Sequence, residues 1–598
     1  MLAFKQYISA QSLEQYLGDP ADAENPFSFK RAIELDEMDA YPAEACDRLN
    51  EWMFHHYYVP REEGGRLEDF EELLSLLRVV AHRDLTVAWA HGMNSILGAV
   101  NVWVGGDDLQ KRRLAQLLKR GEQVAIAYHE KEHGSDMLAV ELEATRESRG
   151  YLLTGEKWVI GNATRSTAMT VFARTDPRGG PRGFSLFFVE KTSLREGSYT
   201  YLPRLKTHGI RGAEISGISF KQCLIPQDSL IGALGQGLEL TLKSFQLTRT
   251  LFTALSLGAA DRALRTTTGF ALSRRLYGGY VFDIPHARLT LVNAFLDLLI
   301  CDCVAISTAR ALHISTEQMS VWSAVAKYFV PMTVEKILAA LAVVLGARYY
   351  LREDYCFGIF QKLLRDSAVV SLGHAGSFTN LQTIAQHLPS LSDGHSRAEQ
   401  HGHEELRRRL HATYSLGEPL PAFAPGRLEI VTRGCDDVLR GAELLPDQLS
   451  DVLPGSGLDP QLGDSLQALA GKLQEQIEAL KRRCAVLVHD HGAAYISSPE
   501  AFDLAKRYCT LHAATSCLYM WLHNRHEPGE FFAEGAWLVL CLDRLLSSHG
   551  GGSVPDQGQY VEAVAEQLSR LHNEDMLFSV VPFQTVDTAH VRGSLIAR

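Results

Sequence analysis

The spacing of hydrophobic positions along this chain changes twice. Up to about residue 120 it is helical, with a broad apolar face from Leu73 to Val80 and acidic residues at 68–72 before it. Short runs of the kind that form β-strands follow, at 151–155, 157–160, 169–173, 184–189 and 215–220. From Gly237 the helical spacing returns. The pattern therefore predicts helices, then a small β domain, then helices again.

The second helical region contains four long segments that are apolar on more than one face. They are 238–267, 284–312, 320–345 and 360–385. Such segments suit an antiparallel helical bundle that is buried on several sides. Beyond a Pro- and Gly-rich stretch, Leu466 to Cys484 carries apolar residues at alternating steps of four and three, which is typical of a packed helix. Further helices are expected at 501–523 and 531–547.

A chain of 598 residues is too long for one hydrophobic core, so several folded units are expected. The predicted domains are a helical domain at 1–120, a β domain at 121–236, a helical bundle at 237–415, a linker at 416–465 and a C-terminal helical domain at 466–598. The predicted fold class is mainly α with a central β domain.

Composition and charge narrow the classes of partner. The chain is 46% hydrophobic and 22% charged, which is typical of a globular protein. A net charge of −12 argues against broad nucleic-acid binding and against docking on an anionic membrane. We see no signal peptide and no uninterrupted apolar run long enough to span a bilayer. The ten scattered cysteines favour reduced thiols, so a cytoplasmic location is expected.

Five segments carry groups of glycine, charged and aromatic residues at defined separations. They are Glu130–Asp136, Gly155–Ala163, Gly209–Gly237, Phe245–Arg249 and Arg274–Gly278. In order and spacing these segments resemble motifs of the acyl-CoA dehydrogenase superfamily. The resemblance covers residues 120 to 385 and implies a helical domain, a β-barrel domain and a four-helix bundle. An extra C-terminal helical domain resembles the acyl-CoA oxidase and long-chain dehydrogenase branches.

The resemblance also implies a chemistry. A base removes the α-proton of an acyl thioester while the flavin of FAD accepts hydride from the β-carbon. The substrate would be carried by CoA or by an acyl carrier protein, and relatives share FAD across a subunit interface, so a homodimer or a dimer of dimers is expected. The unusual residues described next favour a specialised role in biosynthesis.

His374 stands where the family has its catalytic base. In the family an Arg-Asp pair is followed, nine residues after the Arg, by a Glu, and nine residues after Arg365 this chain has His374. Histidine has an ordinary pKa of about 6.5, so it can serve as a base. The family's second location for the base holds Thr248, which cannot take that role. We therefore predict that His374 is the catalytic residue; the alternative is an inert histidine at a helix end.

The resemblance assigns a set of cofactor contacts. They are His129, Ser135, Trp158 or Val159 according to register, Gly161, Arg274, Tyr277 and Gly346. Arg274 and its neighbours resemble a motif that contacts the FAD pyrophosphate across a subunit interface, and guanidinium suits phosphate. Arg249 stands where the family has an Arg near the substrate; a structural ion pair is its alternative.

Several of these positions depart from the family pattern. A hydroxyl residue becomes His129, a Thr becomes Gly161, a Gln becomes Val343, and the family's Glu-Gly-Thr becomes His374-Ala375-Gly376. Three functions therefore remain open: an acyl thioester dehydrogenase, a flavin-dependent monooxygenase on the same fold, and a non-redox enzyme or binding protein that has lost FAD. The His-rich loop at 392–405 fits no zinc spacing, so no metal is expected.

Overall fold

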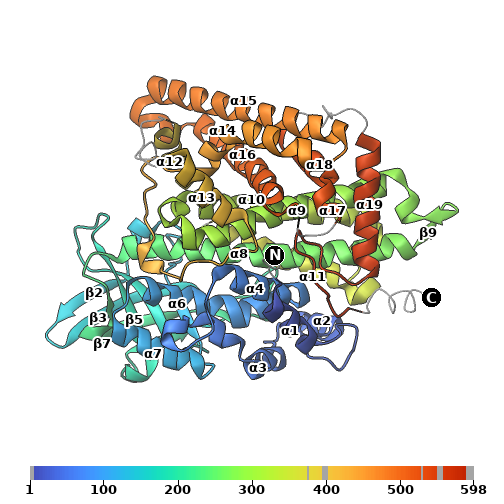
Figure 1. Cartoon of the computed structure of the whole chain (residues 1–598). Helices are drawn as coiled ribbons and strands as arrows, with labels where there is room; N and C mark the ends of the chain where they lie inside the picture. Colours follow the sequence, from blue (N-terminus) through green and yellow to red (C-terminus); the bar gives the residue numbers. More distant parts are fainter. Residues whose placement is uncertain (1–5, 374–375, 393–401, 527–529, 548–556, 588–598) are drawn as a thin grey trace.

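The computed structural model describes residues 6–373, 376–392, 402–526, 530–547 and 557–587. Figure 1 shows three regions: the N-terminal helices and the β domain on one side, a central layer of long helices, and the C-terminal helices on the other side. The order of helices, strands and helices that the hydrophobic pattern predicts is confirmed.

The N-terminal region is built from short helices around one buried helix. They are α1 (Ile8–Leu17), α2 (Phe29–Glu37), α3 (Ala43–Glu51), α4 (Phe70–Arg83), α5 (Leu85–Val87), α6 (Asn94–Gly105) and α7 (Asp108–Lys119). The side chain of Asp69 caps α4 by accepting from the Glu72 amide, and almost every residue of α4 is buried. A π-helical turn, Ala88–Met93, joins α5 to α6. Such turns are frequent at functional sites.

The β domain is one eight-stranded sheet. Its strands are β1 (Val124–Ala127), β2 (Glu143–Glu147), β3 (Gly150–Gly161), β4 (Ala168–Arg174), β5 (Phe184–Glu190), β6 (Tyr199–Leu202), β7 (Ile215–Pro226) and β8 (Leu230–Ile231). The strand order is β6-β7-β3-β2-β4-β5-β8, and β1 pairs in parallel with β4. Two runs that the sequence separates, 151–155 and 157–160, belong to the single strand β3. Its pairing with β7 shifts between Trp158 and Ile160.

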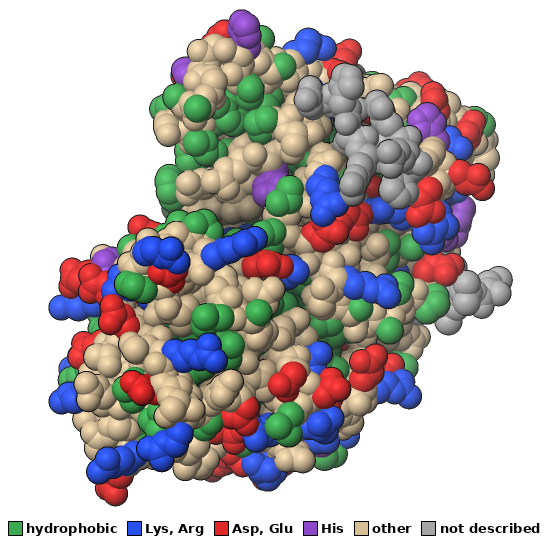
Figure 2. Space-filling model, turned by 90° about the vertical axis from the view of Figure 1, so that its left-hand side faces the viewer, with side chains coloured by type: hydrophobic (Ala, Val, Ile, Leu, Met, Phe, Trp, Pro, Cys, Tyr) green, Lys and Arg blue, Asp and Glu red, His purple; other side chains and the backbone are tan. Residues whose placement is uncertain are grey.

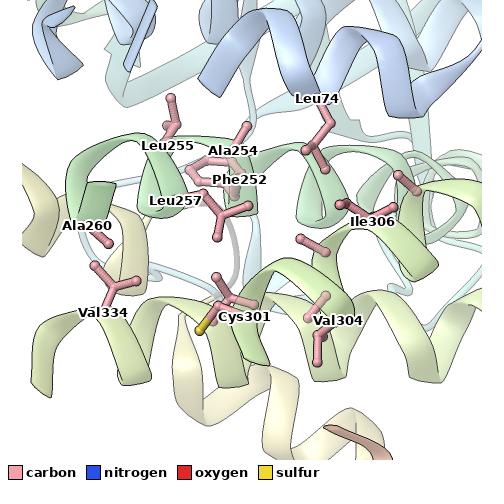
Figure 3. Close-up of a cluster of buried hydrophobic side chains, with 14 of the residues drawn as sticks. Leu74, Phe252, Ala254, Leu255, Leu257, Ala260, Cys301, Val304, Ile306 and Val334 are labelled. Atoms are coloured by element: carbon pink, nitrogen blue, oxygen red, sulfur yellow. The ribbon is translucent and has the colours of Figure 1, made fainter. Parts of the chain in front are cut away.

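The central layer is a bundle of long helices. It contains α8 (Gly237–Ser273), α9 (Pro285–Ile314), α10 (Met319–Leu345), α11 (Ile359–Leu372) and α12 (Ser377–Ser392), with a small hairpin of β9 (Arg275–Leu276) and β10 (Gly279–Tyr280) after α8. Side chains from α4, α8, α9 and α10 meet in its core, among them Leu74, Leu257, Cys301 and Val334 (Figure 3). The single helix expected at 360–385 is wrong, because α11 ends at Leu372 and α12 begins at Ser377.

The C-terminal region is helical and covers the bundle. It contains α13 (His403–Tyr414), α14 (Asp437–Val452), α15 (Pro460–His491), α16 (Pro499–Asn524), α17 (Glu530–Glu534), α18 (Ala536–Leu546) and α19 (Gln557–Asn573). Helices α16 and α18 pack on α9, and α12 packs on α10. In Figure 2, hydrophobic side chains gather on the upper lobe, above a recess that separates it from the lower lobe. The range predicted as a linker contains α14, which includes Pro446.

Within the part of the chain that the structure describes, two helical stretches are long and apolar enough to cross a membrane. They are Pro285–Ile314 and Thr316–Tyr350, although the sequence contains no uninterrupted apolar run of that length. In the most apolar part of the first, 78% of the residues are buried inside the fold, and in the second 44% are. A core helix can be equally long and apolar, so burial inside the fold accounts for the apolar residues of Pro285–Ile314. The second keeps a partly exposed apolar face.

Candidate functional site

A buried ion pair holds the segment that follows β1 against strand β3. The Lys157 ammonium donates to Glu130 Oε1 at 2.9 Å and to the Tyr128 carbonyl at 2.9 Å. Glu130 also accepts from the backbone amides of Glu141 and Leu142. Burial lowers the pKa of Lys157 to about 8, against the opposing effect of Glu130. The ion pair between Glu130 and Lys157 therefore positions the loop that follows β1.

His129 lies inside this braced loop, together with two other predicted cofactor contacts. Its Nδ1 is 3.0 Å from the Gly134 carbonyl, which fits an Nδ1–H donor. Its own carbonyl accepts from the Trp158 amide at 2.9 Å. Burial lowers the pKa of His129, so its imidazole is neutral at neutral pH. Ser135 follows Gly134 and is exposed. The structure thus brings His129, Ser135 and Trp158 to one place.

The end of β3 carries the next two predicted residues. Val159 has a positive φ of 58° and is 41% exposed, at the register shift in the sheet. Trp158 is half-buried and lines a pocket of about 590 Å³ with Leu202, Pro203 and Leu205. The register shift places Trp158 and Val159 in different surroundings. The sequence alone does not decide which of the two corresponds to the family's flavin-stacking position.

Gly161 faces Asn94, a residue that the sequence did not indicate. A Cβ on Gly161 would lie 2.2 Å from Asn94 Oδ1, so the amide occupies the space of a side chain at that position. Asn94 begins α6, directly after the π-helical turn. Its Nδ2 is buried and has no hydrogen-bond partner among the described residues. A polar donor is therefore present beside Gly161, on a different element.

Arg274 and Gly346 come together at the far end of the bundle. Both line a pocket of about 460 Å³, as does Val343. Arg274 follows the last residue of α8 and is exposed, while Gly346 ends α10 with a φ of 63°. Tyr277 lies at the hairpin between β9 and β10, is 96% exposed, and is not among the residues that line this pocket.

Arg249 is buried in the bundle and is only 3% exposed. Its guanidinium lies 5.6 Å from the centre of the Phe245 ring, and burial lowers its pKa to about 10. Among the described residues no carboxylate pairs with it, so the structural ion pair considered as its alternative is not found there.

A second buried cation, Lys327 of α10, lies in the same region. Its ammonium is 4.0 Å from the centre of the Phe252 ring and donates to the Val370 carbonyl near the end of α11. The Trp89 ring packs edge-on against Phe252 at 5.7 Å, and a Cβ on Gly373 would touch that indole at 3.3 Å. Neither Lys327 nor Trp89 was singled out from the sequence, because each is a lone polar group in an apolar helical stretch.

His374 and Ala375 lie outside the described residues. The Arg-Asp pair that precedes them is described and is structural. Arg365 bonds Asp36 of α2 at 2.6 Å, and Asp366 bonds Lys362 at 2.6 Å and accepts from the Ile210 amide at 2.6 Å. These contacts fix α11 against the N-terminal helices and against the loop before β7. The assignment of His374 as the base stays a prediction.

The described residues include no group of three or more histidine, cysteine or acidic side chains that could hold a metal ion. Most of the His-rich loop at 392–405 lies outside the described residues. All ten cysteines are free, and nine of them are buried.

Comparison with known proteins gives matches to both central domains. The family model "Acyl-CoA dehydrogenase, middle domain" matches residues 125–223, and "Acyl-CoA dehydrogenase, C-terminal domain" matches residues 235–388. The probable acyl-CoA dehydrogenase FadE25 of Mycobacterium tuberculosis is 26% identical over 341 residues, which cover 57% of this chain and 86% of that protein.

Two solved structures share the fold. An acyl-CoA dehydrogenase from Bacillus anthracis, complexed with FAD, aligns with a TM-score of 0.67 over 99% of this chain and 93% of its own, at 17% identity. The prolyl acyl carrier protein oxidase AnaB aligns with a TM-score of 0.58 over 64% of this chain and 98% of its own, at 20% identity. At these identities the likeness concerns the fold, and in the first case it includes the C-terminal helices. Residues 125–223 and 235–388 are therefore the middle and C-terminal domains of the acyl-CoA dehydrogenase superfamily, and the architecture around them matches that superfamily's fold.

Proposed function

We propose that this protein is an FAD-dependent oxidoreductase that oxidises an acyl thioester carried by CoA or by a carrier protein, in a specialised biosynthetic pathway. Family membership supports the reaction class, and the names of the relatives support both kinds of carrier. FadE25 is a probable acyl-CoA dehydrogenase, and AnaB is an oxidase of a prolyl acyl carrier protein. The Bacillus anthracis relative is a complex with FAD.

The observation that carries the proposal is the Asn94 amide beside Gly161. The family's hydroxyl side chain is missing at Gly161, which taken alone suggests a lost flavin site. Asn94 occupies that space from another helix and offers a buried N–H with no partner among the described residues. Buried polar groups are nearly always hydrogen-bonded, so this donor fits a ligand acceptor. The described residues therefore fit a flavin whose contacts have been rebuilt.

Two groups of residues would hold FAD. His129, Ser135 and Trp158 of the β domain and Asn94 of α6 belong to the first group. Arg274 and Gly346 line the second, where guanidinium suits a pyrophosphate. When bound, the cofactor supplies the hydride acceptor that the protein side chains lack. The neutral imidazole of His129, held by the Gly134 carbonyl, keeps one ring nitrogen as an acceptor.

Removal of the α-proton requires a base from this chain. His374 is our proposed base, on the sequence resemblance alone. Thr248 is buried and its hydroxyl donates to the Phe245 carbonyl at 3.3 Å, so it does not offer a competing base. A catalytic histidine becomes cationic when it takes the proton, and this charge would favour a neighbouring enolate.

The exposed apolar side chains around the Arg274 pocket support a homodimer. Leu276, Tyr277, Val343, Tyr350 and Leu351 are between 38% and 96% exposed on two adjoining segments. Leu276 and Tyr277 belong to the hairpin after α8, whereas Val343 lies in α10 and Tyr350 and Leu351 follow it. The apolar face of the stretch that contains α10 is only partly covered within one chain. Exposed apolar surface of this kind marks an interaction site. A second copy of this chain would cover it and would bring Arg274 to the partner's cofactor.

An absorption spectrum of the purified protein tests the cofactor. We expect a flavin band at about 450 nm, because the cofactor carries the redox chemistry. Colourless protein that does not take up added FAD would contradict the proposal. Anaerobic reduction of that band by acyl thioesters tests the reaction; a need for an external reductant and dioxygen would instead identify a monooxygenase.

The His374→Ala variant tests the base. It should keep the flavin band and lose flavin reduction by about 100- to 10,000-fold, the usual contribution of a general base. Unchanged single-turnover reduction would remove the assignment and leave the rest of the proposal intact.

A further inference from the structure

The buried cations of this protein fall into two groups. Seven of them pair with a described carboxylate: Arg78 with Asp302, Arg83 with Glu14, Lys157 with Glu130, Arg262 with Asp587, Arg265 with Asp575, Arg310 with Glu71, and Lys362 with Asp84 and Asp366. Lys191 of the β domain is 8% exposed and donates to the Ala163 carbonyl. Arg249 and Lys327 are equally buried, at 3% and 1% exposed, and have no carboxylate partner among the described residues. A buried charge is costly unless it is paired, so this pair requires an explanation.

Arg249 and Lys327 lie close to each other on two neighbouring helices. Phe252 of α8, one turn after Arg249, packs against the Lys327 ammonium at 4.0 Å. The two positive charges act on each other: burial, and then Arg249, lower the pKa of Lys327 to about 7. Facing aromatic rings and the Val370 carbonyl offset only part of the cost. The charged groups of the neighbouring α11 do not help, because Lys362 and Asp366 bond each other.

Two further donors in this region lack a partner among the described residues. They are Nε of Arg249 itself and Nε1 of Trp89, both buried. Trp89 reaches the region through its contact with Phe252. The site thus presents N–H donors and positive charge from the π-helical turn, α8 and α10. This combination is complementary to an anion.

We propose that Arg249 and Lys327 bind a carboxylate on the acyl group of the substrate, so that the substrate is a half-thioester of a dicarboxylic acid. This inference rests on the proposed function, because the thioester brings its acyl group to the site. A carboxylate is the anion that an acyl chain carries on its own carbon skeleton. Guanidinium binds it in two parallel hydrogen bonds, and the nearby ammonium adds a second charge-assisted contact.

Matched pairs of CoA thioesters test the inference on the full-length protein with its flavin. Malonyl-, succinyl- and glutaryl-CoA are compared with propionyl-, butyryl- and valeryl-CoA, which have the same numbers of acyl carbons and no acidic group. We expect one acidic thioester to bind about 10- to 100-fold more tightly than its neutral counterpart in titration calorimetry. Its binding at pH 8 should also take up a proton, because the anion raises the pKa of Lys327.

Two variants assign the preference to these residues. Lys327→Met and Arg249→Leu should each abolish the preference for the acidic thioester while keeping the flavin band and the binding of the neutral one. Lys191→Met is the matched control, since Lys191 is a buried lysine of the β domain with a pKa lowered to about 8 by burial. It should keep the preference.

The outcomes separate this inference from the proposed function. Equal binding of all acidic and neutral pairs, with the flavin band present, overturns the anion site and leaves the oxidoreductase. Loss of the flavin band in Lys327→Met overturns it as well, since the cation would then serve the cofactor. So does loss of flavin reduction by both kinds of thioester, which would make Lys327 part of the chemistry. If the wild-type protein is colourless but still prefers an acidic thioester, the proposed oxidoreductase function is contradicted and the proposed anion site is supported.

Discussion

Two groups of buried arginines and lysines carry the same positive charge, but different partners compensate that charge. Around α4 the cations are tied to carboxylates from distant segments. Arg310 bonds Glu71 at 2.7 Å, and Arg262 bonds Asp587 near the end of the described chain. Between α8 and α10, the partners that the described residues offer Arg249 and Lys327 are aromatic rings and one carbonyl. The first arrangement is complete within the chain, whereas the second becomes complete only with an anion.

The paired group also connects the C-terminal segment to the bundle. Asp302 of α9 accepts from Arg78 at 2.6 Å and from the Val580 amide at 3.0 Å, and Asp261 of α8 accepts from the Phe578 amide at 2.7 Å. Because these contacts are buried, water cannot solvate a charged group whose partner is removed, and its charge stays uncompensated. We therefore expect substitutions in the two groups to affect stability in opposite directions.

The largest effect is expected from Arg310→Met. Besides Glu71, the Arg310 guanidinium holds the carbonyls of Thr413, Ala412, Ser415 and Glu418, all within 3.0 Å. Its loss leaves Glu71 buried and charged, so the free energy of unfolding should fall by about 3–5 kcal/mol. Urea denaturation followed by circular dichroism measures it. A loss below about 1 kcal/mol would show that this pair does not differ from a surface pair.

A second substitution should recover part of that loss. In the double variant Arg310→Met/Glu71→Gln the uncompensated charge is removed, while the amide can still accept from the Tyr7 hydroxyl, which donates to Glu71 at 2.8 Å. We expect it to be more stable than Arg310→Met by about 1–2 kcal/mol. A double-mutant cycle with Glu71→Gln alone measures this coupling. Additive losses would contradict the explanation.

Lys327→Met should behave in the opposite way. It removes a cation that has no described carboxylate, so stability at pH 7 should be unchanged or raised by up to about 2 kcal/mol. The difference should depend on pH. Above the folded-state pKa of about 7, the folded chain has released the Lys327 proton. The unfolded chain keeps it up to about pH 10.4, so the wild type gains stability with rising pH in this window.

The measurement compares wild type and Lys327→Met between pH 6 and pH 10. The wild type should gain stability relative to Lys327→Met as the pH rises, since groups that titrate in both proteins cancel in the difference. A difference that is constant over this range would mean that Lys327 stays charged in the folded protein and has a partner.

The smallest effect is expected at the surface. Arg178 and Asp176 form an exposed pair at 2.8 Å, and the Arg178 hydrogen bonds lower the pKa of Asp176 to about 2. Exposed pairs contribute little because water and salt screen them. Arg178→Met should therefore leave the urea midpoint of the wild type unchanged within error. A shift as large as that of Arg310→Met would show that burial does not explain the difference in stability between the two ion pairs.

Much of the fold follows from local patterns. The helical periods at 238–267, 284–312 and 320–345 predict α8, α9 and α10, because an apolar surface on several faces can be satisfied only inside a bundle. The range 416–465 shows the limit of such reasoning. Its prolines predict a linker, yet α14 forms around Pro446 because packing against α13, α15 and α16 supports it.

The candidate site was predictable only in part. The family resemblance assigned Arg274 and Gly346 to one set of cofactor contacts, and both residues line one pocket. Asn94, Trp89 and Lys327 were missed, because a single polar residue in an apolar stretch has no local sign of what it will face. Gly161 illustrates the reason: its lost side chain is replaced from a helix that lies far before it in the sequence.

The sequence by itself determined the superfamily, the succession of helical and β regions, and the residue types available for chemistry, because motifs and hydrophobic periods are local properties of the chain. Which charges are compensated was decided by the tertiary structure alone. The interaction of two buried charges depends on their separation and on the solvent around them. Only the packing of α8 against α10 sets these for Arg249 and Lys327.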